Sequence, residues 1–124
     1  MIKLIPVESR EDVKKICEEK NIPYGENVYA YIGADNEKGL GIFSIDGYRM
    51  QILLVEYFDD MLLAELLVRA IANYGANRSV YLISMKEDYI SSTLETLHFE
   101  KNDNGEYVGK IPNVLSGCCH CDKK

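Results

Sequence analysis

The stretch from Leu40 to Lys101 constrains the fold of this chain more than any other part of the sequence. It begins with a predicted strand at Leu40–Ile45, and the Asp-Gly pair that follows favours a tight hairpin turn. The next predicted strand, Tyr48–Tyr57, is the longest, and its centre is continuously apolar, as in strands covered on both faces. An apolar helix then leads to a strand at Ser79–Met85. A right-handed helical crossover of this kind places the two strands side by side and parallel.

The helix between these strands carries signals at both ends. Asp59 or Asp60 can cap its N-terminus, and the apolar pattern predicts a helix that runs to about Tyr74. Gly75 is predicted to be its C-cap, because glycine readily adopts the left-handed conformation found there. The apolar face of this helix is wide, so we expect it to cover one face of the sheet.

The flanking segments extend the same sheet. Ile2–Val7 predicts a short strand, and Ser9 can cap the helix that follows it. Val28–Ala34 predicts another strand, Glu87–Leu97 a helix, and Asn104-Gly105 the turn of a last hairpin. The predicted order is therefore βα–βββ–α–β–α–ββ. An α/β (α+β) fold with a mixed sheet and helices on both faces is the economical arrangement of these elements.

Length and charge restrict the class of protein. A chain of 124 residues fits a single domain, predicted over residues 1–111, followed by a tail at residues 112–124. The net charge is −6 and no segment concentrates Lys and Arg on one face, which argues against a nucleic-acid partner. The sequence has no stretch that is apolar and long enough to span a membrane, and no signal peptide, so we expect a cytoplasmic protein.

Four short patterns, in this order and spacing, resemble the GNAT superfamily of acetyl-CoA-dependent N-acetyltransferases. The patterns are Gly41-Ile42-Phe43, Leu54-Val55, the segment 65–72 of the long helix, and Leu97-His98-Phe99-Glu100. The resemblance covers residues 1–111, with a loop at Asn21–Asn27 in place of most of the family's second helix. It implies a GNAT-like acyl-CoA N-acyltransferase fold, acetyl-CoA as cofactor, and an amine of a small molecule or protein as substrate.

The same resemblance places a cofactor site at the start of the long helix. In the family, the pyrophosphate of acetyl-CoA lies on backbone N–H groups of a glycine-rich loop at this helix terminus. The corresponding loop of this chain has neither glycine nor a cation, and Asp59 and Asp60 would occupy the N–H groups and repel a pyrophosphate. The positions that the resemblance assigns to cofactor binding are Val55, Tyr57, Asp60, Met61 and Leu62.

Glu56, at the end of the long strand, is the candidate catalytic residue. Acidic residues at this position can act as general base for an amine in relatives, directly or through water. The alternative is an exposed glutamate at a strand end with no catalytic role. The family's usual tyrosine acid corresponds to Leu94, and an asparagine of the last helix corresponds roughly to Glu87.

The tail carries the densest group of soft metal ligands, at Gly117-Cys118-Cys119-His120-Cys121. Cys118, His120 and Cys121 are candidate zinc ligands, although a closed zinc site takes four. Two tails in a homodimer could combine, and a tail with reactive thiols and no metal is an equal alternative. Cys17, by contrast, lies on the apolar face of the first helix, which predicts a small buried residue.

Three functions are consistent with these patterns. The first is an N-acetyltransferase that moves an acetyl group from acetyl-CoA to an amine. The second is a catalytically degenerate binding or regulatory module that does not use CoA. The third is a metal- or redox-responsive role carried by the tail. Fold alone does not choose among them.

Overall fold

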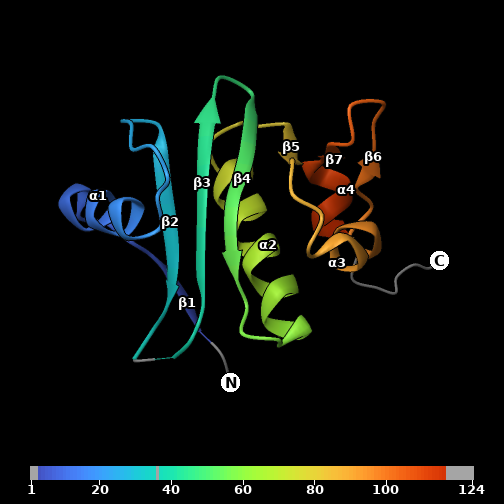
Figure 1. Cartoon of the computed structure of the whole chain (residues 1–124). Coiled ribbons are helices and arrows are strands. Elements are labelled where there is room, and N and C mark those ends of the chain that lie inside the picture. The colour runs from blue at the N-terminus through green and yellow to red at the C-terminus, as the bar shows by residue number, and fades with distance from the viewer. Residues whose placement is uncertain (1–2, 36, 117–124) are drawn as a thin grey trace.

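The computed structural model describes residues 3–35 and 37–116, and these form one mixed sheet with helices on both faces (Figure 1). The sheet has seven strands in the order β1-β2-β3-β4-β5-β7-β6. The strands are β1 (Leu4–Pro6), β2 (Val28–Gly33), β3 (Leu40–Asp46), β4 (Arg49–Glu56), β5 (Leu82–Met85), β6 (Glu100–Lys101) and β7 (Tyr107–Lys110). The helices are α1 (Arg10–Glu19), α2 (Met61–Ala76), α3 (Ser91–Thr96) and α4 (Ile111–Ser116).

The pairing of the strands confirms the predicted topology. β4 and β5 are parallel neighbours joined through α2, whereas the other neighbouring strands of the sheet are antiparallel. The β3–β4 hairpin turns at Gly47, whose φ of 65° is a left-handed conformation that glycine adopts without steric cost. This hairpin is the one that the Asp-Gly signal predicts.

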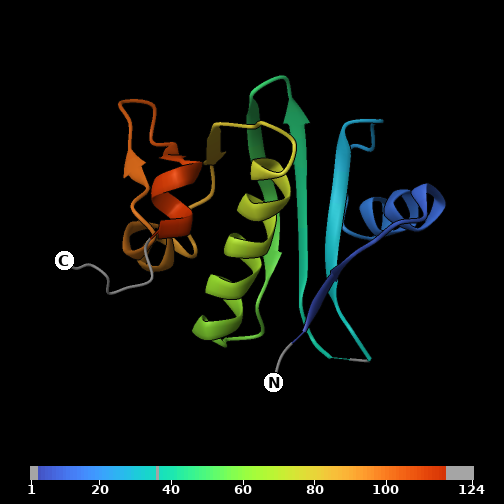
Figure 2. The same cartoon turned by 180° about the vertical axis from the view of Figure 1, so that it is seen from behind.

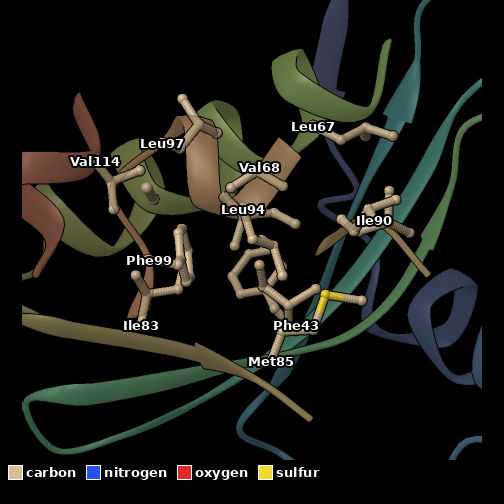
Figure 3. Packing of buried hydrophobic residues seen from close by; sticks show 14 of the residues in the cluster. Phe43, Leu67, Val68, Ile83, Met85, Ile90, Leu94, Leu97, Phe99 and Val114 are labelled. Carbon is tan, nitrogen blue, oxygen red and sulfur yellow. The ribbon is translucent and has the colours of Figure 1, made fainter. Parts of the chain in front are cut away.

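Two apolar cores hold the helices to the two faces of the sheet. The larger core lies between the sheet and α2, α3 and α4, of which Figure 2 shows α2 and α4 in front of the strands. Figure 3 shows its centre, where Phe43 and Met85 of the sheet meet Leu94 of α3. The smaller core joins α1 to β2 and β3 through Val13 and Cys17. On this face α1 packs mainly on β2 and β3, so helices cover less of this face than of the face that carries α2, α3 and α4.

Local signals at the helix N-termini are confirmed. The Ser9 hydroxyl accepts a hydrogen bond from the Asp12 N–H at 3.3 Å, and Asp60 is the N-cap of α2. A side-chain oxygen at this position satisfies N–H groups that have no partner within the helix. Cys17 is fully buried, as its position on the apolar face of α1 predicts.

Two predictions of helix ends differ from the structure. Gly75 is not the C-cap of α2: it lies inside the helix, and Asn77 is the C-cap. A Cβ at Gly75 would overlap the Sδ atom of Met50, so close packing, not a turn, explains this glycine. The helix predicted over Glu87–Leu97 forms only at Ser91–Thr96.

The tail predicted from residue 112 begins instead with a helix. α4 starts at Ile111, includes Pro112 and buries Ile111 and Val114. Pro112 fits the first turn of this helix, because its missing N–H would have no intrahelical partner there. Among the helices that the structure describes, none is both long and apolar enough to cross a membrane.

Candidate functional site

The candidate site lies where β4 and β5 separate. The two strands pair only from Arg49↔Leu82 to Ile52↔Met85, whereas β4 continues to Glu56. A β-bulge precedes this end of β4, because Ile42 pairs with Leu54 and the next residue of β3 pairs with Ile52. Bulges bend a strand and re-aim the groups that follow, and they are common beside functional sites. The end of β4 therefore presents backbone groups that β5 does not pair.

Tyr89 occupies one of these backbone groups. Its hydroxyl accepts a hydrogen bond from the Val55 N–H at 2.9 Å. Its ring stacks on Tyr57, with 6.4 Å between the ring centroids and 7° between the planes. Burial raises the pKa of the Tyr89 hydroxyl above its usual value, although the hydrogen bond from Val55 acts in the opposite direction. The hydroxyl thus stays protonated and holds the separated end of β4 to the loop before α3.

The start of α2 is occupied by its own capping residue. The Asp60 carboxylate accepts hydrogen bonds from the N–H groups of Leu62 at 3.1 Å and Leu63 at 3.3 Å. These N–H groups and the positive end of the helix dipole are what an anionic ligand would need at this terminus. A carboxylate already bound there competes with such a ligand and repels it.

The loop before α2 has an unusual backbone. Phe58 and Asp59 are consecutive residues with left-handed φ values of 51° and 59°. This conformation costs roughly 1–2 kcal/mol for a residue with a side chain, and aspartate tolerates it better than phenylalanine. Lys38 brings a cation to this loop, with its Nζ atom 5.5 Å from the centroid of the Phe58 ring. The sequence alone did not associate Lys38 with this loop.

Glu56, the predicted general base, is ion-paired in the structure. Its Oε2 atom lies 2.7 Å from the Nζ atom of Lys20, the C-cap residue of α1, and both side chains are about one-third exposed. The ion pair holds the carboxylate toward α1, while the Val55 N–H one residue earlier points to Tyr89. A base role for Glu56 would therefore require Lys20 to move or to share the carboxylate.

A shallow cavity of about 310 Å³ lies between the start of α2 and α3. Met61 and Leu62, two of the positions assigned to cofactor binding, line it together with polar residues of α3. Leu94, at the family's tyrosine position, is fully buried in the larger core and offers no acid to this region. The groove therefore has Met61, Leu62 and the acidic Glu65 on its α2 side and hydroxyl-bearing residues on its α3 side.

The predicted zinc ligands Cys118, His120 and Cys121 lie outside the described residues. Within residues 3–35 and 37–116, no group of three or more His, Cys, Asp or Glu could hold a metal ion. Burial raises the pKa of the Cys17 thiol, which fits a structural role for this cysteine.

Solved structures similar to this chain share its fold. A ribosomal-protein-alanine N-acetyltransferase from Escherichia coli has a TM-score of 0.64 at 12% identity, covering 90% of this chain and 94% of its own. An aminoglycoside acetyltransferase in complex with coenzyme A has a TM-score of 0.61 at 17% identity, covering 91% and 96%. An acetyltransferase from Bacillus subtilis in complex with CoA has a TM-score of 0.59 at 15% identity, covering 81% and 77%. No family model matches the sequence. No curated protein matches it either.

Proposed function

Because this chain has the fold of the GNAT acyl-CoA N-acyltransferases, we propose that it is a binding module on that fold which does not use CoA. The single observation that carries this proposal is the hydrogen bonding of the Asp60 carboxylate to the Leu62 and Leu63 N–H groups. A pyrophosphate would have to displace this carboxylate while two acidic side chains, Asp59 and Asp60, repel it. The cost of displacing the carboxylate and the electrostatic repulsion both oppose pyrophosphate binding. The loop also has no glycine that would let the backbone approach the ligand closely.

The contacts of Tyr89 support the same proposal. A thioester carbonyl bound at the end of β4 would need a free backbone N–H to polarise it. The Val55 N–H already donates to the Tyr89 hydroxyl, and the stacking on Tyr57 holds the ring in place. The protein thus satisfies with its own side chains the groups that a cofactor of this fold would use.

The test is a thermal melt of the purified protein with increasing acetyl-CoA. We expect no change in the midpoint for the wild type, whereas a ligand at a hundred times its Kd stabilises by about 2.7 kcal/mol. Asp60→Gly removes the carboxylate and frees the N–H groups, so this variant should gain a ligand-dependent shift. Asp59→Gly is the matched control, because it removes the same charge and leaves the cap intact. Saturable stabilisation of the wild type equal to that of Asp60→Gly would overturn the proposal.

An acetyl-CoA-dependent N-acetyltransferase is the second candidate, favoured by the separation of β4 from β5 beyond Ile52 and Met85. In such an enzyme the thioester carbonyl would replace the Tyr89 hydroxyl at the Val55 N–H. Glu56 would accept a proton from the amine, which attacks the thioester carbon to give an amide and the free thiol of CoA.

This candidate is tested by incubating the wild type and Tyr89→Phe with acetyl-CoA and a panel of primary amines. Mass spectrometry then detects the N-acetylated amine. Product formed by the wild type at a rate above that of the uncatalysed reaction would establish the enzyme and refute the CoA-independent module.

A further inference from the structure

The face of the sheet opposite α2 carries a second cavity, of about 320 Å³, over β3, β4, β5 and the loop that precedes β7. We call it the sheet-face trough. Its polar lining includes Ser44, Asp46, Arg49, Gln51, Ser84 and Glu106. The core under α1 includes residues of β2 and β3 but, from β4, only the partly buried Leu53 and Leu54, so the trough lies beyond the area that α1 covers. Figure 1 shows α1 beside β2, at a distance from β5 and β7.

The register of the sheet aligns the floor of the trough. Ser44 pairs with Gln51 across β3 and β4, and Gln51 pairs with Ser84 across β4 and β5. Directly paired residues project to the same face, and neighbours along each strand project to the other. Ile52 and Ile83 accordingly lie in the larger core. A row of three polar side chains therefore crosses the centre of the sheet, where an apolar row would be expected under a covering helix.

Few of these polar side chains have a partner among the residues that the structure describes. Gln51 is half-buried, yet its side-chain amide forms no hydrogen bond with any residue of 3–35 or 37–116. Arg49 is paired in register with Asp46, but their charged groups form no ion pair in this part of the chain. The Ser84 hydroxyl donates only to the Met50 carbonyl, at a long 3.5 Å. Gln51 and Ser84 are half-buried and Arg49 and Asp46 are exposed, so the donors and acceptors of this row are open to water and to a polar ligand.

The charged residues of the trough indicate which chemical groups a ligand would need. Arg49 offers a planar donor that suits a carboxylate, and Asp46 and Glu106 offer two acceptors that suit ammonium or guanidinium groups. At about 320 Å³ the trough is at the small end of the range for ligand pockets, which favours a small molecule such as a free amino acid. We propose that the sheet-face trough binds a basic α-amino acid with a free carboxylate, such as lysine or arginine. This inference rests on the binding role proposed above, because it names the ligand of that module.

The experiment is a titration of the isotope-labelled full chain with free L-lysine, followed by amide NMR spectra. We expect saturable shifts at Gln51 and Ser84 and at the loop that carries Glu106. L-Glutamate has the carboxylate without the second cation, and cadaverine has both cations without the carboxylate, so each should bind at least tenfold more weakly. If none of these residues shifts with L-lysine or L-arginine, or if the shifts lie elsewhere, the proposal is wrong.

Variants separate the two charged ends of the ligand. Arg49→Gln should weaken L-lysine binding roughly tenfold or more and leave the weak binding of cadaverine unchanged. Arg78→Gln is the matched control, since Arg78 stacks on Tyr74 and donates to its carbonyl, outside the trough. Equal weakening by both variants would contradict the assignment. Acetyl-CoA added to the same sample tests the proposed function independently, because its binding would shift Leu62 and Leu63 and leave Gln51 and Ser84 unaffected.

Discussion

Removal of the Tyr89 hydroxyl tests whether this residue closes the separated end of β4. Tyr89→Phe keeps the ring and its stacking on Tyr57 but leaves the Val55 N–H without its acceptor. A hydrogen bond of this kind contributes about 0.5–1.5 kcal/mol net to folding, and a backbone N–H left unpaired and buried costs about 1–3 kcal/mol. Because this bond is only partly buried, water can reach the N–H, and we expect a loss of about 1 kcal/mol in the free energy of unfolding.

This loss converts to a measurable change in the melting midpoint. For 124 residues at about 2.1 cal/mol/K each, the entropy of unfolding is about 260 cal/mol/K, so 1 kcal/mol lowers Tm by about 4 °C. Tyr57→Phe is the matched control, because it deletes the hydroxyl of the stacked partner, which has no hydrogen bond within the described residues. Its stability should stay within about 0.5 kcal/mol of the wild type.

Two assays together decide the outcome. Calorimetric or chemical denaturation gives the difference between the two variants, and native-state hydrogen exchange reports the Val55 amide directly. We expect faster exchange at Val55 in Tyr89→Phe and unchanged exchange in Tyr57→Phe. Equal stability of the two variants, together with an unchanged exchange rate at Val55, would refute the assignment of Tyr89 as the residue that closes this end of the strand.

Three further predictions follow from buried groups. Gly75→Ala should lower the free energy of unfolding by about 1 kcal/mol. Overpacking against Met50 and Val80 costs about 1–3 kcal/mol, whereas the gain in helix propensity is only about 1 kcal/mol. A Tm higher than that of the wild type would contradict this prediction. Burial raises the pKa of Tyr31 above its ordinary 10.0, so the folded state holds this proton more tightly than the unfolded chain. The corresponding stability is intact below about pH 10 and is lost as pH rises through the folded pKa, and urea titrations should show a smaller alkaline loss in Tyr31→Phe. Cys17, fully buried and with a raised pKa, should resist alkylation in the native protein, as peptide mass mapping can verify; rapid labelling would show that α1 opens readily.

The predictions that held rest on local chemistry and periodic patterns. The Asp-Gly pair predicted the β3–β4 hairpin, and the crossover rule predicted the parallel pairing of β4 with β5. Asp59 or Asp60 was predicted to cap α2, and the two hydrogen bonds of Asp60 confirm the capping and identify the residue. Each of these inferences depends on a few neighbouring residues, whose conformational preferences act before any distant contact forms.

Sequence reasoning failed where a residue's role comes from a partner far along the chain. Gly75 was interpreted as a helix end, whereas it is the point where α2 packs closely on Met50. Residues 112–124 were interpreted as a tail, whereas the helix α4 extends to Ser116 and buries Val114. Tyr89 was assigned to a helix because its neighbours fit a helical pattern, but its hydroxyl bonds to Val55, 34 residues earlier.

The candidate site likewise has some features that follow from adjacent residues and others that depend on distant contacts. The sequence by itself determined the charge at the start of α2, because Asp59 and Asp60 are adjacent to the helix whose N–H groups they would occupy. Only the tertiary structure decided which groups close the end of β4, that Lys20 pairs with Glu56, and that Ser44, Gln51 and Ser84 form one row. The physical reason is that helix capping depends on adjacent residues, whereas sheet register, strand separation and ion pairing depend on distances that exist only once the chain has folded.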